Sequence, residues 1–287
     1  MAKYDDAAIT QAVIDRFAET PNPRLKVLLN GLTRHLHAFV RETEPTFDEW
    51  LYAIKYLTAV GHKSEGPRQE FILLSDVMGV SMLVDAVNHK LPEGATETTV
   101  LGPFYADSAP RFEQGADITG GMEGESLYVD VAVKSVSGQP LPGATVDVWQ
   151  SDSEGFYDVQ RVDRGEGAKL RGQLTADDEG RVRFWSILPT AYPIPYDGPV
   201  GELLTATRRH PWRPAHLHFM IAADGFETLV THLFVEGDPY LASDAVFGVK
   251  DSLIQAFPRH EPSAAPEGRL LEATWRSLEF DFALKSA

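Results

Sequence analysis

Two histidines placed two residues apart are the strongest chemical signal in the sequence. They are His216 and His218, in the segment Arg213-Pro-Ala-His-Leu-His-Phe219. In a strand, residues i and i+2 project from the same face, so both imidazoles can reach one metal ion. His35 and His37 have the same spacing, but they lie in a stretch with helical periodicity, where two steps of about 100° turn them apart. The pair at 216 and 218 is therefore the candidate metal site.

The remaining ligands of such a site are open at this point. A 2-His-1-carboxylate Fe(II) centre needs an Asp or Glu, and the nearby Asp224 and Glu227 flank Gly225, which indicates a turn beyond the strand. A set of His216, His218 and His232 binding Zn or Fe(II) is an alternative. Phenols are a third source of ligands, because Fe(III) binds phenolate strongly enough to displace a proton whose usual pKa is about 10.

The composition narrows the choice of ligands and partners. The 287 residues contain no cysteine, which excludes disulfides, zinc–thiolate sites, iron–sulfur clusters and cysteine nucleophiles. A net charge of −16 predicts no general affinity for nucleic acid or anionic membranes. The N-terminus has charged residues and no apolar core typical of a secretory signal, and no stretch approaches about 20 apolar residues, so we expect a cytoplasmic protein.

Helical elements come first in the chain. Apolar residues recur at three- and four-residue steps from Leu25 to Val40. Thr46-Phe-Asp-Glu49 is a capping box, which predicts a helix through Trp50 and Leu57. A longer helix is expected from about Gln69 to Met82. The sequence therefore indicates a helical part over residues 1–91.

Strands dominate the remainder. Residues 92–125 are rich in Pro, Gly, Thr and acidic residues and form a linker that we expect to contribute to the substrate pocket. From residue 126 onwards the period becomes two. The expected strands, each bounded by turn residues, are Leu127–Val133, Thr145–Trp149, Arg181–Ile187, His216–Ala222 and Leu229–Val235. The predicted fold class is α+β, with a helical N-terminal part followed by an antiparallel β-sandwich over residues 126–287.

Several phrases together resemble the intradiol ring-cleaving dioxygenases of catechol-type substrates. They are Gly155-Phe-Tyr157, the proline-flanked Tyr192, Arg213-Pro-Ala-His-Leu-His218, Leu101-Gly-Pro-Phe-Tyr105 and Asp244-Ala-Val-Phe-Gly248. The resemblance covers nearly the whole chain, and it implies a helical dimerisation part that could retain a lipid. Three phrases are most similar to the members that act on hydroxyquinol: Tyr192-Pro-Ile-Pro-Tyr-Asp-Gly-Pro199, Arg209-His-Pro-Trp-Arg-Pro-Ala-His216 and Asp238-Pro-Tyr-Leu-Ala-Ser-Asp-Ala-Val246.

The resemblance implies roles for individual residues. The Fe(III) ligands would be Tyr157, Tyr192, His216 and His218, with Tyr192 leaving the metal when substrate binds. Arg213 would stabilise negative charge on the substrate ring, as a guanidinium can at any working pH. The residues implied for substrate binding besides Arg213 are Leu73, Asp76, Val100, Leu101, Gly102, Pro103, Phe104, Ile194, Pro195 and Val246.

One departure from the family pattern concerns His232. Many catechol 1,2-dioxygenases have glutamine at the matching strand position, whereas this sequence has Leu229-Val-Thr-His232. A third imidazole could hydrogen-bond a metal-bound hydroxide or an intermediate, or it could be a core histidine with its own partners. Both interpretations stay open on the sequence.

The resulting hypothesis is an Fe(III) enzyme that opens hydroxyquinol between its two vicinal hydroxylated carbons with O2, giving 3-hydroxy-cis,cis-muconate, the tautomer of maleylacetate. Catechol or a chlorocatechol is the alternative substrate. A histidine-ligated Zn or Fe(II) enzyme is a more distant alternative. So is a non-catalytic transthyretin-like module, which Gln139-Pro-Leu-Pro-Gly143 also resembles. The colour of tyrosinate bound to Fe(III) distinguishes the first hypothesis from the other metal enzymes and from the module.

Overall fold

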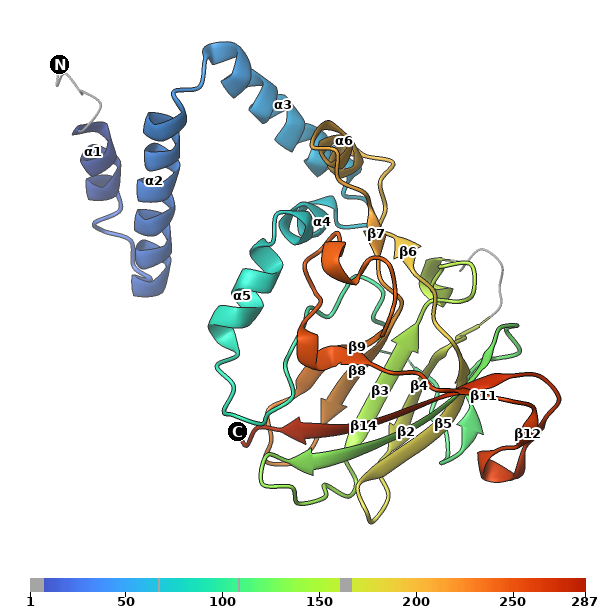
Figure 1. Ribbon diagram of the computed structural model, residues 1–287. Coiled ribbons are helices and arrows are strands. Elements are labelled where there is room, and N and C mark those ends of the chain that lie inside the picture. Colours follow the sequence, from blue (N-terminus) through green and yellow to red (C-terminus); the bar gives the residue numbers. More distant parts are fainter. Residues whose placement is uncertain (1–7, 67, 108, 161–166) are drawn as a thin grey trace. The chain divides into compact units, whose positions relative to one another are not determined.

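The chain folds into two compact units, Met1–Ala59 and Val60–Ala287. The computed structural model describes residues 8–66, 68–107, 109–160 and 167–287. The helices in these ranges are α1 (Ala8–Arg16), α2 (Pro23–Thr43), α3 (Phe47–Lys63), α4 (Glu70–Val77), α5 (Val80–Asn88) and α6 (Pro199–Ala206). None of the helices in the described ranges has the length and apolar character of a membrane span. Figure 1 shows that all but α6 precede the strands in the chain.

The first unit contains α1, α2 and most of α3, and its helices begin where side chains cap them. The carboxamide oxygen of Asn22 accepts hydrogen bonds from the backbone N–H groups of Arg24 and Leu25, at the start of α2. Thr46 and Glu49 form the expected capping box, because the Thr46 backbone N–H donates to the Glu49 carboxylate and the Glu49 N–H donates to the Thr46 hydroxyl. The predicted start of α3 is confirmed.

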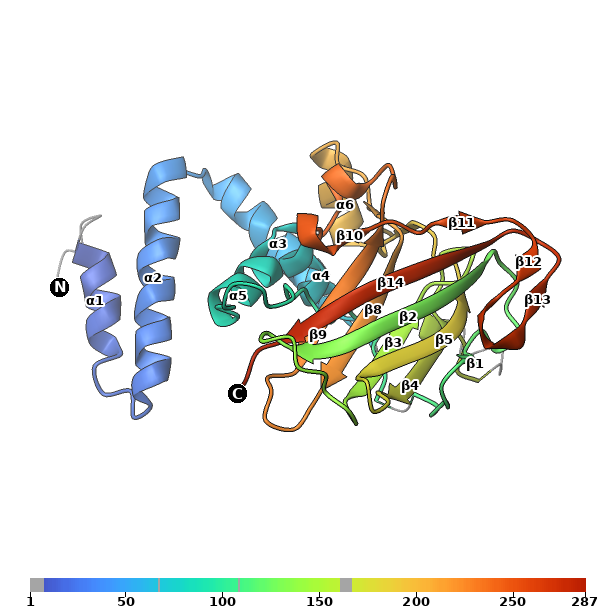
Figure 2. The same cartoon turned by 60° about the horizontal axis from the view of Figure 1, so that its bottom comes forward.

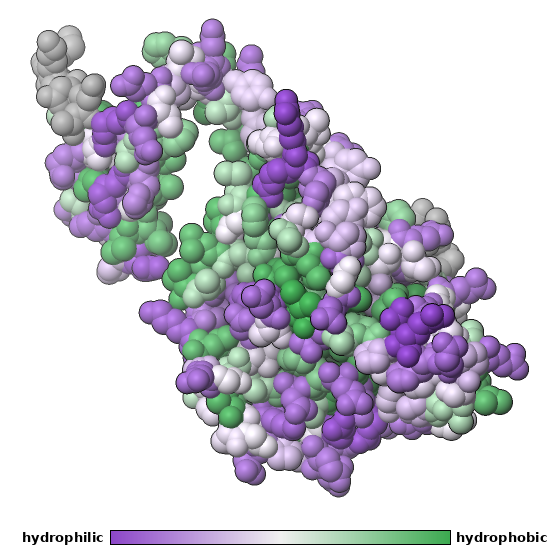
Figure 3. Space-filling model, viewed as in Figure 1, coloured by the Kyte–Doolittle hydropathy of each residue, from purple (hydrophilic) through white to green (hydrophobic). Residues whose placement is uncertain are grey.

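Much of the apolar surface of α2 has no partner within its own unit. Seven of its large apolar side chains are at least 45% exposed, namely Leu25, Val27, Leu28, Leu32, Leu36, Phe39 and Val40. Figure 3 shows hydrophobic surface on α2 and also on α5, a helix of the second unit. An exposed apolar stripe of this size is typical of a surface that another molecule covers.

The single long helix expected from Gln69 is two helices, α4 and α5. The chain breaks at Gly79, whose φ of 72° is in the left-handed region that glycine adopts without cost. The N–H of Gly79 donates to the carbonyl of Asp76, which closes a turn in place of continuing the helix. The apolar spacing from Phe71 to Met82 predicted helical residues correctly, and it could not show that glycine would divide them.

The second unit is built around two five-stranded sheets that pack face to face (Figures 1 and 2). One sheet has the strand order β1-β5-β2-β14-β11 and the other β10-β9-β8-β3-β4, while β12-β13 and β6-β7 are separate pairs. The strands are β1 (Ala116–Asp117), β2 (Ser126–Ser135), β3 (Thr145–Gln150), β4 (Arg171–Thr175), β5 (Arg181–Ile187), β6 (Tyr192–Pro193), β7 (Trp212–Arg213), β8 (His216–Ala222), β9 (Leu229–Val235), β10 (Ile254–Gln255), β11 (Arg259–His260), β12 (Ser263–Ala264), β13 (Leu270–Leu271) and β14 (Trp275–Leu284).

The α+β class is confirmed, but the sheets are mixed and not purely antiparallel. The longest pairing joins β14 to β2 in parallel over ten residue pairs, and β1 with β5 and β10 with β9 are also parallel. Parallel neighbours need long connections, so the spacing of turns along the sequence gives no sign of them. The strand β14 itself was missed, although Leu278, Phe280 and Phe282 alternate with polar residues.

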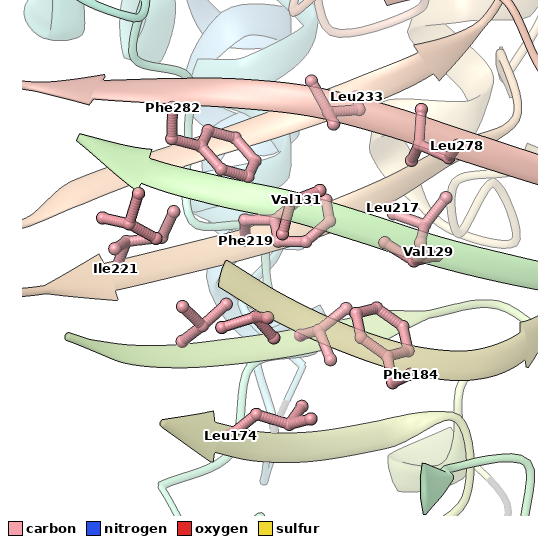
Figure 4. Packing of buried hydrophobic residues seen from close by; sticks show 14 of the residues in the cluster. Val129, Val131, Leu174, Phe184, Leu217, Phe219, Ile221, Leu233, Leu278 and Phe282 are labelled. Atoms are coloured by element: carbon pink, nitrogen blue, oxygen red, sulfur yellow. The ribbon is translucent and has the colours of Figure 1, made fainter. Parts of the chain in front are cut away.

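The core lies between the two sheets and decides which way β8 faces. Val129 and Val131 of β2 meet Leu217 and Phe219 of β8 in this layer, and all four are fully buried (Figure 4). Because side chains alternate along a strand, the residues of β8 on either side of Leu217 point to the opposite face. The core therefore directs His216 and His218 out of the sandwich interior and together onto one face.

Candidate metal centre

Strand pairing places three ring side chains next to one another on the outer face of the second sheet. His218 is opposite Trp149 of β3 on one side and opposite His232 of β9 on the other. Directly opposite residues share a face, so the rings make contact across the strands. Trp149 stacks on His218 with centroids 4.7 Å apart, and the His218 and His232 centroids are 4.2 Å apart. The register of three strands thus assembles the histidines.

The two predicted histidine ligands converge through their Nε2 atoms. These atoms are 3.1 Å apart, and the Tyr157 hydroxyl oxygen lies 3.0 Å from Nε2 of His218. The Nδ1–H of His216 donates to the carbonyl of Pro214 at 2.7 Å, which leaves a lone pair on Nε2. Several lone-pair atoms directed at one point form the arrangement that a metal ion requires.

Both predicted tyrosine ligands reach the same place, Tyr157 from a loop and Tyr192 from the short strand β6. Tyr157 is 1% exposed and Tyr192 is 3% exposed, and their ring centroids are 5.3 Å apart. The ring of Tyr192 is 5.6 Å from that of His216, and Phe104 stacks on Tyr157 at 4.5 Å. The structure therefore brings together two phenols and two imidazoles that are widely separated in sequence.

Burial favours the uncharged form of these groups. It lowers the pKa of His216 to about 3, with a further contribution from the nearby Arg213 charge. The pKa of His218 is also well below its ordinary value, through burial and then the neighbouring imidazole of His232. Burial and the adjacent Tyr192 raise the pKa of Tyr157 well above that of free phenol. Neutral imidazoles suit a metal, and only a strongly acidic cation would deprotonate this phenol, so the donor set fits Fe(III).

His232 lies against this cluster and lacks partners of its own. It is fully buried, and neither ring nitrogen has a hydrogen-bond partner within the described residues. Burial and the neighbouring His216 lower the pKa of His232, and the nearby backbone of Val100 partly offsets this lowering. The nitrogen atoms of His216, His218 and His232 all lie within 4.8 Å of one another. A buried imidazole gains from a further hydrogen bond, so a role of His232 beside a metal stays a prediction.

Arg213 is the positive charge of the site. It is 3% exposed, and one guanidinium nitrogen lies 3.4 Å from Nε2 of His216. Asp244 accepts two hydrogen bonds from it, at 3.0 and 3.2 Å. Burial opposes the charge of Arg213, but Asp244 outweighs this, so the pKa of Arg213 is raised above its usual value. The guanidinium is therefore charged, oriented and adjacent to the ligand cluster.

A cavity of about 820 Å³ opens beside the tyrosines. Six residues predicted for substrate binding line it, namely Leu73, Asp76, Pro103, Phe104, Ile194 and Pro195. Its volume is in the range typical of small-molecule sites, and most of its lining is apolar. Phe104 also stacks on Tyr157, so one wall of the cavity reaches the ligand cluster.

Four other predicted residues do not line this cavity. Val246 packs in the same apolar cluster as Leu73 and Ile194. Gly102 approaches the metal cluster, because a Cβ there would lie 3.3 Å from Cε1 of His218. The backbone of Val100 lies near His232, and Leu101 is 38% exposed. These positions stay predictions for substrate contact.

Sequence reasoning missed several residues of the site. Ten further residues line the cavity, namely Arg68, Gln69, Ile72, Tyr105, Phe156, Val159, Gln160, Pro193, Tyr196 and Asp197. In the sequence, Asp244 belongs to a family-like phrase that implies no role for it, and Trp149 is evident only as a strand residue. A buried Asp opposite a buried Arg is a usual pairing, yet no local pattern indicates that residues 213 and 244 meet.

Gly155 controls how closely the two tyrosine loops approach. Its φ is +86°, and an added Cβ would lie 3.0 Å from Cβ of Tyr192. We expect Gly155→Ala to destabilise the protein by about 1–2 kcal/mol through backbone strain and also to displace Tyr192 and weaken metal binding. Gly143→Ala is the matched control, since φ is +75° there with nothing within 4 Å. Denaturant unfolding and metal analysis of both variants test this; equal metal retention would contradict it.

Comparison with known proteins agrees with this geometry. A catechol dioxygenase N-terminus family matches residues 22–96 and a dioxygenase family matches residues 100–286. The chain is 52% identical to a 6-chlorohydroxyquinol 1,2-dioxygenase of Cupriavidus pinatubonensis, over 99% of both proteins. It is 51% identical to a hydroxyquinol 1,2-dioxygenase of Rhodococcus opacus, over 96% of this chain and 92% of that protein.

A solved structure of a dioxygenase is also similar to this chain. The hydroxyquinol 1,2-dioxygenase of Pseudomonas putida superimposes with a TM-score of 0.92 at 45% identity, covering 98% of this chain and 99% of that one. The helical N-terminal part and the sandwich correspond to the two parts of a ring-cleaving dioxygenase. The chain belongs to the intradiol dioxygenase family.

Proposed function

We propose that this enzyme cleaves hydroxyquinol with O2 at an Fe(III) ion held by Tyr157, Tyr192, His216 and His218. The observation that carries the proposal is the convergence of two buried phenols and two neutral imidazoles beside an apolar cavity. Relatives with hydroxyquinol 1,2-dioxygenase activity in their names support the choice of substrate. When bound there, Fe(III) supplies the Lewis-acid and redox chemistry that lets a bound diolate react with O2.

The residues of the chain manage protons and charge in this reaction. The diol of the substrate would lose two protons as it binds: a hydroxide ion would accept one, and the phenolate oxygen of Tyr192 would accept the other and become a neutral phenol. The guanidinium of Arg213, oriented by Asp244, faces the negative charge that the diolate brings into a protein of net charge −16. Both atoms of O2 enter the product, a hydroxylated muconate with two carboxylates.

His232 has a role in this proposal that its surroundings support. Its ring nitrogens have no hydrogen-bond partner in the described part of the chain, and its ring lies against both histidine ligands. One nitrogen would hydrogen-bond an oxygen at the metal during turnover. A buried donor without a partner gains most from such a contact, because its desolvation has already been incurred.

Asp76 is the polar residue that would recognise the third hydroxyl of hydroxyquinol. It lines the cavity at 7% exposure, and its pKa is raised chiefly by burial. We expect kcat/KM for hydroxyquinol to exceed that for catechol, and Asp76→Ala to narrow the difference by about tenfold, since a site built for a hydroxyl penalises its absence by roughly 1–3 kcal/mol. Steady-state oxygen uptake with both substrates measures the ratio.

Two further variants separate recognition from stability. Asp76→Asn keeps a hydrogen-bonding group and should retain most of the preference. Asp85→Ala removes a buried aspartate that pairs with Lys250 and does not line the cavity, so it should lower stability without changing the ratio. Equal losses on both substrates in Asp76→Ala would assign Asp76 to helix packing. Faster turnover of catechol by the unmodified enzyme would make catechol the substrate.

We also propose that the enzyme is a homodimer joined through its N-terminal helices, with a lipid retained in the apolar groove that they form. The exposed apolar stripe of α2 supports this proposal. Leu36→Glu is expected to shift the mass measured by light scattering from dimer to monomer, because a charge would be buried in an apolar contact. Lys55→Glu, an exposed charge change on α3, is the control. A monomer at micromolar concentration in the unmodified protein would contradict the proposal.

A further inference from the structure

A second cavity, of about 480 Å³, lies apart from the one beside the tyrosines. It is formed between the end of α6 and the segment that contains a short 3-10 helix, Leu241–Ser243. Its lining shares no residue with the first cavity and consists of Arg208, Arg209, His210, Leu241, Ala242, Ser243, Asp244, Phe247 and Val249. The volume is sufficient for a small organic molecule.

Two residues of the lining hold a backbone conformation that disfavours them. Arg208 has φ 56° and Phe247 has φ 59°, both in the left-handed region. Arg208 follows the C-terminus of α6, where the N–H of Arg209 bonds to the carbonyl of Leu204, and glycine usually occupies such a position. A side chain there costs about 1–2 kcal/mol relative to glycine. Strain of this kind is typical of functional positions, and here both strained residues line one cavity.

The polar groups of the cavity suit an anion. Arg209 is fixed by hydrogen bonds to the carbonyls of Val77 and Ala245, and its guanidinium lies 5.0 Å from the ring centroid of Phe247. The Arg208 guanidinium, in contrast, has no hydrogen bond or ion pair within the ranges that the structure describes. In a protein of net charge −16, an exposed arginine without an ion-pair partner is a local positive charge that can attract a small anion.

Two further residues of the lining, Ser243 and Asp244, have hydrogen bonds that affect how an anion would bind. The backbone N–H of Trp212 donates to Nδ1 of His210, so Nε2–H of His210 donates to the hydroxyl of Ser243 and leaves that hydroxyl free to donate. The carboxylate of Asp244 is occupied by Arg213 and by the N–H of Gly248, which reduces its repulsion of an anion. Leu241, Phe247 and Val249 provide apolar surface.

We propose that this cavity is a second binding site, which takes a small organic carboxylate. Arg208 and Ser243 bind the carboxylate group, and Leu241, Phe247 and Val249 contact its carbon skeleton. Two kinds of molecule carry such a carboxylate group. One is a six-carbon dicarboxylate of the type that ring cleavage produces, and the other is an aromatic carboxylate. The site does not depend on the metal, so its existence is independent of the proposed function.

Calorimetric titration of the metal-loaded enzyme tests the proposal, with adipate as one probe and benzoate as the other, while the visible spectrum is recorded. We expect at least one probe to bind without shifting the visible band. The probe that binds more tightly shows which of the two kinds of carboxylate the cavity prefers. Arg208→Gly should weaken this binding more than about tenfold, leave turnover without the probe unchanged and raise Tm, because it removes both the charge and the strain.

Two controls make the result specific. Arg208→Lys keeps a charge at the cavity and should retain part of the affinity, and Arg259→Ala removes an exposed arginine from the distant β11 and should retain all of it. No binding of either probe at about 10 mM would overturn the proposal. So would binding that Arg208→Gly leaves unchanged, or heat that always accompanies a shift of the visible band, which would place the probe at the metal.

Discussion

Replacing Arg213 with methionine is expected to lower kcat/KM for hydroxyquinol by about 10²–10³-fold while the metal stays bound. Removing one preorganised electrostatic group from a water-excluded site has an effect of this size, since no solvent can replace it. Arg213 is 3% exposed and lies 3.4 Å from His216, so the lost charge is adjacent to a proposed metal ligand. Oxygen uptake and metal content, measured on the same preparation, separate turnover from metal loss.

The same change leaves the Asp244 carboxylate buried without its cation, which destabilises the fold by about 3–5 kcal/mol. The double variant Arg213→Met/Asp244→Asn removes that charge and keeps an acceptor oxygen for one of the two N–H groups, those of Val246 and Gly248, that the carboxylate accepts from. We expect it to recover stability in urea but not activity. Recovery of activity as well would mean that Arg213 serves only to satisfy Asp244.

Tyr157→Phe is expected to lower iron occupancy by at least about tenfold and to weaken the visible phenolate-to-iron band. Removing a ligand should cost no less than the 10–100-fold typical of residues that merely orient ligands. Tyr128→Phe is the matched control, because Tyr128 is a buried tyrosine that bonds Glu267, packs on Trp185 and is absent from the ligand cluster. Metal analysis and visible spectra of both variants provide the test.

A colourless protein that contains zinc would contradict the tyrosine ligation. The three-histidine cluster of His216, His218 and His232 would then hold the metal alone. Equal iron content and colour in Tyr157→Phe and in the unmodified enzyme would likewise remove Tyr157 from the ligand set. The two results differ in whether iron is present, so the identity of the metal and the identity of its ligands are tested separately.

Local sequence was enough to place α2, α3, five of the strands and the histidine pair. Alternation along residues 216–222 predicted a strand, and β8 is His216–Ala222. The Thr46–Glu49 capping box predicted the start of α3 for the same reason, since hydrogen bonds between residues three apart depend only on the nearby chain. The predicted domain bounds at residues 91 and 125 remain a prediction. The compact units divide at a different place, between Ala59 and Val60.

The sequence by itself determined the residue types that can form this site: two strand histidines, two tyrosines, an arginine nearby and no cysteine. Only the tertiary structure decided that Trp149, His218 and His232 share one face, that Asp244 orients Arg213, and that β14 runs parallel to β2. These contacts join residues far apart in the chain. Their formation depends on strand register and on burial of the common core, and local periodicity contains neither.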